Sequence, residues 1–570
     1  MSSVSFRCAS LFLLLTLIGC ARLGTHVESS ADAPHYLQAS PSLPRADMYY
    51  DYLAAQHFLR TKQIDQAIEA YKDALKKDPR SPLLLAELAS LYVRQGKIDM
   101  ALKLAEEATA INPRYETGYM LLGQLYAGSG KNDKAIASYK RVLEMNPNNE
   151  DAYLLLGALY AQEGKFTEAM EVFDRLRTLL PDNPVALYYK ARVFLDMKFY
   201  DQAEYIYNEV LSLDSTFENA FLDLAYIYEV TERSNDAEKT YQKILAFNPS
   251  SVQARTRLGN LYMRQNKFDD ALQQFGQLLR LNRKDMESRL KIGIIHLQQK
   301  SYEAAIQDFA YLLKEEPQYD QALYYMGSAY EEKEDLEQAI LNFRMVARTS
   351  PLWNTAQVRL ALIFAKMKDY KSSAEVLREA IDKRPDVADF YMYLGVVYEE
   401  QKQYEEAIKV LDKGIEKASK DVDLLFRKGI VLDKSGKKDE ALSVMQLILE
   451  VEPQNPNALN YIGYTYAEKG INLLEAKQMI QKALDAQPED GYIMDSLGWV
   501  YYKLGQPKKA LETILEALKR VPNDPVIQEH LGDIYLNLGR KAKAVEAYER
   551  AIEYNHNEPE KIQEKLKNLK

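Results

Sequence analysis

Cysteine, histidine and tryptophan are scarce in this chain of 570 residues, which has two cysteines, six histidines and two tryptophans. The histidines, at positions 26, 35, 57, 296, 530 and 556, include no pair with the spacing of metal ligands on one element. We therefore expect no metal and no cofactor.

Long apolar runs and an excess of positive charge are also missing. The apolar run Leu11–Ile18 is too short to span a bilayer, and no later segment approaches that length. With 73 basic and 83 acidic residues and no basic stripe, nucleic acid is not an expected partner.

Gly128–Lys131 has the look of a phosphate loop. That motif needs Gly where Leu125 stands and Ser or Thr where Asn132 stands, so we expect no nucleotide.

The apolar run has the length of a signal-peptide core and leads into Gly19 and Cys20. A signal of this shape that ends in a small residue and Cys resembles the lipobox of bacterial lipoproteins. The resemblance implies that residues 1–19 are a cleaved signal peptide and that Cys20 is acylated, which leaves no thiol for a disulfide or for catalysis. Ala21 stands where an inner-membrane retention signal often has Asp, which implies the outer membrane. An ordinary signal peptide with an incidental Cys20 is the other interpretation.

Residues 20–47 are interpreted as the lipidated cysteine and a tether. From Ala21 onward the composition changes to Ser, Ala, Pro and scattered charge, and no apolar residue recurs at a helical or strand period. Such a segment is predicted to be disordered. On random-coil scaling it would reach roughly 30 Å from the membrane surface.

Residues 48–556 repeat one pattern every 34 residues. Prolines mark the grid, with Gly or Ala 24 residues earlier, Ala 12 residues earlier, and an aromatic residue three places after the first small residue. One instance is Pro79 with Ala55, Ala67 and Phe58. The pattern resembles the tetratricopeptide repeat (TPR). The resemblance implies an all-α superhelical solenoid of about fifteen helix-turn-helix repeats.

The small residues are expected where the two helices of a unit cross, and turns such as Gln95–Lys97 and Glu163–Lys165 supply a glycine at positive φ. The grid slips by one residue within Lys469–Leu474, where we expect the turn of the thirteenth unit. Residues 557–570 are predicted to be a capping helix, because Ile562, Leu566 and Leu569 form one narrow apolar stripe.

Partner binding is expected in the groove that TPR proteins form from positions two, five, nine, twelve and thirteen of each first helix. Over repeats nine to twelve these positions are acidic and aromatic. We expect a protein or peptide segment there, with a basic and partly apolar character. Glu331, Glu332, Glu399 and Glu400, at positions twelve and thirteen, are expected on solvent-facing helix surface. The full set is Glu331, Glu332, Asp389, Glu399, Glu400, Asp423 and Asp433 with Tyr324, Met392 and Phe426. Charges that are merely solvated are the alternative interpretation.

The strings Asn460–Tyr464 and Asp495–Trp499 are similar to those of a subset of Gram-negative TPR lipoproteins. That subset includes an outer-membrane adaptor that presents cell-wall hydrolases to a periplasmic C-terminal-processing protease. Tyr464 and Trp499 both fall on position nine, where they either bind a partner or pack within the chain.

The sequence therefore indicates a non-enzymatic, lipid-anchored TPR scaffold at the outer membrane that faces the periplasm. The favoured hypothesis is an adaptor that brings an envelope enzyme and its clients together. The alternative is a structural assembly factor for an exopolysaccharide or protein export apparatus.

Overall fold

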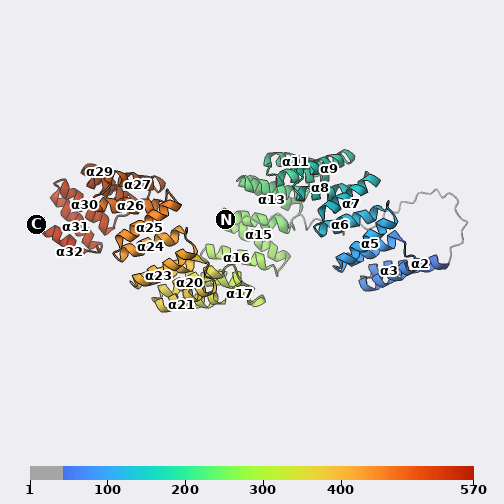
Figure 1. Ribbon diagram of the computed structural model, residues 1–570, viewed down its shortest axis with the longest axis horizontal. Coiled ribbons are helices and arrows are strands. Elements are labelled where there is room, and N and C mark those ends of the chain that lie inside the picture. Colours follow the sequence, from blue (N-terminus) through green and yellow to red (C-terminus); the bar gives the residue numbers. More distant parts are fainter. Residues whose placement is uncertain (1–42, 570) are drawn as a thin grey trace. The chain divides into compact units, whose positions relative to one another are not determined.

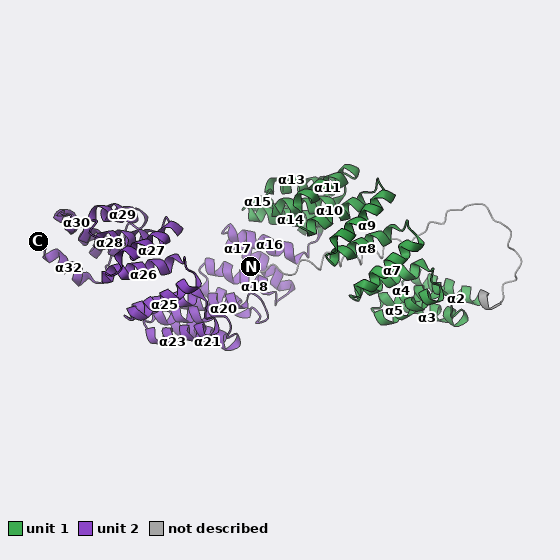
Figure 2. Ribbon diagram, turned by 45° about the horizontal axis from the view of Figure 1, so that its top comes forward, with its two compact units in different colours: residues 1–281 green, residues 282–570 purple. Residues whose placement is uncertain are grey.

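The structure is a computed structural model that describes residues 43–569. Every regular element in this range is a helix, and the helices follow one another as antiparallel pairs (Figure 1). The predicted signal peptide, Cys20 and most of the predicted tether lie outside the described residues. The all-α prediction is confirmed. The chain divides into two compact units, residues 1–281 (unit 1) and 282–570 (unit 2), coloured separately in Figure 2.

The described part of unit 1, residues 43–281, contains seven helix pairs. Their bounds are α2 (Leu43–Arg60), α3 (Ile64–Lys77), α4 (Pro82–Arg94), α5 (Ile98–Ile111), α6 (Glu116–Gly128), α7 (Asn132–Met145), α8 (Glu150–Gln162), α9 (Phe166–Leu179), α10 (Pro184–Asp196), α11 (Tyr200–Leu213), α12 (Glu218–Val230), α13 (Ser234–Phe247), α14 (Val252–Arg264) and α15 (Phe268–Leu281).

Unit 2 contains eight further pairs and a last single helix. Their bounds are α16 (Met286–Gln298), α17 (Tyr302–Glu315), α18 (Asp320–Glu332), α19 (Leu336–Met345), α20 (Trp353–Lys366), α21 (Tyr370–Lys383), α22 (Ala388–Glu400), α23 (Tyr404–Lys417), α24 (Val422–Lys434), α25 (Lys438–Val451), α26 (Pro456–Lys469), α27 (Leu473–Ala486), α28 (Gly491–Lys503), α29 (Pro507–Arg520), α30 (Pro525–Asn537), α31 (Lys541–Glu553) and α32 (Pro559–Lys567).

Small residues let the two helices of a pair approach closely, as the sequence predicts. A Cβ atom added to Gly123 would lie 2.4 Å from the ring of Tyr139, which belongs to the second helix of the same repeat. At Gly157 the added atom would lie 2.5 Å from the ring of Phe173. Even one extra methyl group would therefore force the helices apart or displace a buried ring.

The turns inside the repeats contain the predicted left-handed residue. Gly96 and Gly164 both have φ of 72°. Eight repeats place a non-glycine residue in this conformation, which costs an L-residue roughly 1–2 kcal/mol. These residues are Lys62, Lys198, Glu232, Asn266, Lys300, Glu334, Lys368 and Lys402. The one-residue slip lies in the predicted turn, where Gly470 and Asn472 are both left-handed.

One helix begins earlier than predicted, and another ends earlier than its equivalents in other repeats. The first helix begins at Leu43, so the last five residues of the predicted tether are helical. Helix α19 ends at Met345, although most other second helices have 14 residues. The side chain of Asp320 accepts a hydrogen bond from the Ala347 N–H at 2.8 Å, which holds the chain that leaves α19 in a non-helical path.

The C-terminal end is covered by α32. Its residues Ile562 and Leu566 are buried against Tyr548 and its neighbours on α31. The apolar face of the last repeat is therefore removed from solvent, as the stripe in the sequence predicts.

Candidate protein-interaction surface

The candidate surface consists of the residues at positions two, five, nine, twelve and thirteen of the first helices, which we call the first-helix face. In unit 2 it runs over α18, α20, α22 and α24 and contains the acidic and aromatic residues singled out from the sequence. Their surroundings in the structure separate them into two groups.

Three of the acids are bound by side chains of the next repeat, and we call them the paired acids. Glu331 forms an ion pair with Arg359 at 2.7 Å. Glu399 is paired with Lys434 at 2.6 Å and with Arg427 at 3.4 Å. Asp433 accepts a hydrogen bond from the Tyr461 hydroxyl at 2.8 Å.

The expectation that Glu399 faces solvent is wrong. Its side chain is only 6% exposed, because Arg427 and Lys434 from the following repeat close over it. Glu331 is also only partly exposed and is held by Arg359. Reversing charge at either position would remove an ion pair within the chain, so these two residues cannot serve as neutral probes of partner binding.

The other four acids are exposed, and no ion pair in the described part of the chain involves them. We call these residues the open acids: Glu332, Asp389, Glu400 and Asp423. Burial raises the pKa of Asp389, and the neighbouring carboxylates of Asp421 and Asp423 raise it further. The contribution of these two carboxylates reflects the negative charge gathered around the first turns of α22 and α24.

The aromatic and apolar residues of the same face are half-buried. Tyr324 packs edge-to-face against Tyr325 and Phe343, with ring centroids 5.4 Å and 5.6 Å away. Met392 and Phe426 are partly covered by the cores of their repeats. Each keeps a partly exposed surface, and Met392 and Phe426 lie one helical turn after the open acids Asp389 and Asp423.

The two aromatic residues near the C-terminus differ in accessibility. Trp499 is 6% exposed. Its indole stacks between His530 at 4.0 Å and Tyr502 at 4.9 Å, and its N–H donates to Glu468. The packing interpretation therefore holds for Trp499. Tyr464 is half-buried, with its ring 6.2 Å from that of His530.

Sequence reasoning missed a buried charge network around Trp499. His530 is 4% exposed and lies 2.8 Å from the carboxylate of Asp495. Burial alone would lower the pKa of His530, but Asp495, with Glu529 and Asp533, outweighs it, and the pKa is raised. Glu529 is bound by Lys565 at 2.7 Å and by His556 at 2.9 Å. We call Asp495, Trp499, Glu529, His530, Asp533, His556 and Lys565 the C-terminal network.

Two other residues weighed in the sequence have structural positions. His296 stands at the repeat position that is aromatic in most other repeats, is half-buried and lies 2.9 Å from Asp308, so it packs within its repeat. Gly130, in the segment that resembles a phosphate loop, has φ of 69° and belongs to the turn between α6 and α7. In residues 43–569 no helix is both long and apolar enough to cross a bilayer.

Comparison with known proteins finds the tetratricopeptide repeat along most of the chain. One sequence model of the repeat matches residues 120–184, 256–320, 302–352, 358–422 and 496–558, and a second matches residues 58–125. A TPR repeat-containing protein of Pseudomonas aeruginosa is 39% identical over 62 residues, which are 11% of this chain. The chain spans about a tenth of the length of that relative.

Solved structures that are similar include Naa15/Naa10 bound to HypK-THB, with 15% identity, a TM-score of 0.32 and coverage of 92% of this chain and 96% of the other. The Cut9–Hcn1 hetero-tetramer of the APC/C has 14% identity, a TM-score of 0.37 and coverage of 86% and 98%. A tetratricopeptide repeat protein from Parabacteroides merdae has 21% identity, a TM-score of 0.37 and coverage of 44% and 99%. Because one repeat model alone matches more than half of its residues, this chain belongs to the tetratricopeptide repeat family.

Proposed function

We propose that this protein is a membrane-anchored TPR scaffold at the outer membrane that holds an envelope enzyme together with its clients. Membership of the TPR family supports the general part of this proposal, a scaffold for protein–protein interaction. The anchor rests on the lipobox-like sequence that ends at Cys20.

The observation that carries the binding site is the set of open acids. Glu332, Asp389, Glu400 and Asp423 are exposed and have no ion-pair partner among residues 43–569. Asp389 and Asp423 lie one helical turn before the half-buried Met392 and Phe426. Uncompensated negative charge steers cations, and partly exposed apolar side chains supply contact area. A basic, partly apolar segment of a partner fits this chemistry.

Site-specific crosslinking in intact cells tests the binding site. A photoreactive phenylalanine analogue replaces Phe426 in the full chain. The control places it at Leu447, an exposed residue of the second helix α25. We expect adducts with an envelope enzyme or its clients from position 426 and not from position 447. Adducts with polymerases or outer-membrane channels would support the assembly-factor function instead, and equal adducts from both positions would contradict a site on the first-helix face.

Labelling with palmitate tests the anchor separately. The Cys20→Ser variant is expected to lose the label. Its precursor is expected to remain uncleaved at this site. Retained label and unchanged fractionation would contradict the lipoprotein proposal while leaving the binding site untouched.

A further inference from the structure

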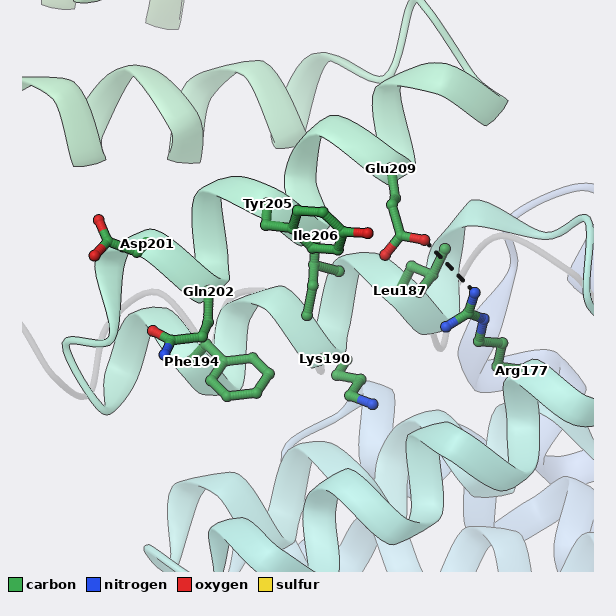
Figure 3. A pocket seen from close by; sticks show the side chains of 9 residues that line it. All are labelled: Arg177, Leu187, Lys190, Phe194, Asp201, Gln202, Tyr205, Ile206 and Glu209. Carbon is green, nitrogen blue, oxygen red and sulfur yellow. Dashed lines mark ion pairs between the residues drawn. The ribbon is translucent and has the colours of Figure 1, made fainter.

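A recess opens in unit 1 beside α10 and α11 (Figure 3). Its volume is about 400 Å³. Leu187, Phe194 and Ile206 supply its apolar lining, and Asp201 and Tyr205 of α11 lie at its edge. The recess belongs to a different surface from the first-helix face, because none of its lining residues occupies a first-helix-face position.

Most of the charge around the recess is compensated within the chain. Lys190 takes a position that is Leu or Ile in most other repeats, and its ammonium group reaches Asp174 at 2.7 Å. Arg177 lies 3.6 Å from Glu209, the pair joined by the dashed line in Figure 3. Asp201 is exposed and forms no ion pair in the described part of the chain. One negative charge at the recess, that of Asp201, therefore has no partner among residues 43–569.

The ring of Phe194 differs from its equivalents in other repeats. In nine repeats the aromatic residue three places after the small residue has a lysine or arginine over its ring, 4.4 to 5.8 Å from the centroid. Such a cation is attracted by the negative face of the ring. The nine rings are those of Tyr92, Tyr126, Tyr160, Tyr228, Tyr262, Phe364, Tyr398, Tyr501 and Tyr535.

No lysine or arginine among residues 43–569 lies over Phe194, because every position that supplies the cation elsewhere holds another residue type. Phe199 stands at the position of Lys97, and Gln202 at that of Lys134. The two positions on the preceding helix α9 hold Met170 and Asp174. No lysine or arginine in the described range lies over the rings of Phe58, Tyr330 and Tyr466 either, but none of these rings lines this recess.

We propose that the recess binds the side chain of an arginine from a partner protein. A guanidinium group stacks on an aromatic face and pairs with a carboxylate at the same time, so it satisfies both Phe194 and Asp201. Tyr205, which is 69% exposed, and the lining residue Ile206 cover the aliphatic part of the arginine. The partner supplies the cation that the other repeats provide themselves.

Methyl NMR on the full chain tests the proposal with two probes of the same shape. One is acetyl-Gly-Arg-Gly-amide, and the other carries citrulline, which has no charge, in place of arginine. We expect the arginine peptide to shift the methyl signals of Leu187 and Ile206, and the citrulline peptide to bind at least tenfold more weakly. Equal shifts with both peptides would show that binding does not depend on the charge and would overturn the proposal, and so would the absence of shifts with either peptide.

A substitution that supplies an internal cation completes the test. Gln202→Lys places a lysine where Lys134 lies over Tyr126 in the third repeat. This substitution is expected to weaken binding of the arginine peptide at least fivefold. Gln338→Lys makes the same change at the same repeat position of α19 and should have no effect. Unchanged binding by Gln202→Lys, with the helical fold retained by circular dichroism, would overturn the proposal. Neither variant changes an open acid, so the two sites succeed or fail independently.

Discussion

Two stretches of unit 2 carry acidic residues on the first-helix face, and the chain uses them differently. In the C-terminal network Asp495 is bound by His530, and Glu529 by Lys565 and His556. On α22 and α24, Asp389, Glu400 and Asp423 are exposed without ion pairs in the described residues. The same repeat face therefore serves packing in one stretch and leaves charge available in the other. An acidic residue in a repeat indicates a binding site only when the neighbouring repeat does not neutralise it.

The largest effect on stability is expected when the buried pair of Asp495 and His530 is broken. Asp495→Ala leaves the imidazole of His530 buried without its carboxylate and should cost about 3 kcal/mol of local stability. Hydrogen exchange in α28, α30 and α32 measures the loss. Asp423→Ala, which removes an open acid, should change stability by no more than about 0.5 kcal/mol. Equal costs for the two variants would remove the distinction between the stretches.

A smaller difference in the free energy of unfolding is expected between variants at two adjacent residues of α22. Glu399→Gln weakens the pairs with Arg427 and Lys434 and should cost about 1–2 kcal/mol, because these two cations are partly exposed. Glu400→Gln should be neutral within about 0.5 kcal/mol. Urea denaturation of the two variants measures the difference. A neutral Glu399→Gln would show that the buried ion pairs contribute nothing to the fold.

The effect of pH on the stability of the fold should be the smallest of these effects. It should have opposite signs in the two stretches. The pKa of Glu529 is lowered, so its stabilising contribution is present above the ordinary value of 4.5 and is lost as the pH falls through the folded pKa. The pKa of Asp389 is raised above 3.8, so protonation of this residue stabilises the fold as the pH falls. Carboxyl carbon NMR should place the two midpoints on opposite sides of their ordinary values.

His530 of the C-terminal network makes the stability of this stretch depend on pH above 6.5 as well. The pKa of His530 is raised above 6.5, so its contribution is complete below that pH and is lost as the pH rises through the folded pKa. Hydrogen exchange of α28 and α30 should therefore accelerate as the pH rises through that range, after correction for intrinsic exchange. Asp495→Asn should move this dependence to lower pH, because it removes the largest contribution that raises the pKa of His530, and an unchanged profile in that variant would contradict the assigned pair.

The repeating elements could be predicted from the sequence because each depends on a local requirement. Gly123 and Gly157 are needed where helices cross, and Gly96 and Gly164 where the chain adopts positive φ. The early end of α19 could not be predicted, because it depends on a hydrogen bond from Ala347 to Asp320, 27 residues away.

The burial of Glu399 was missed for a related reason. Its partner Arg427 lies 28 residues further along, the same separation as between Glu331 and Arg359 and between Asp433 and Tyr461. That spacing is a signal that a sequence can carry, since position twelve of one repeat meets position six of the next. The stacking of Trp499 on His530 needed the structure, because two chemically plausible roles fit the same position.

The central claim is that the open acids, and not the paired acids, bind a basic partner. The most direct measurement is the affinity of the full chain for a peptide of alternating lysine and phenylalanine at low salt. We expect neutralising Glu332, Asp389, Glu400 and Asp423 together to weaken it by roughly 1–3 kcal/mol, one to two orders of magnitude, with an effect that shrinks as salt screens the charges. We expect no change in affinity when four exposed acids of the second helices that form no ion pair in the described residues are neutralised instead, Glu337, Glu375, Glu416 and Glu440. Equal affinity of the fourfold open-acid variant and the native chain would contradict the claim.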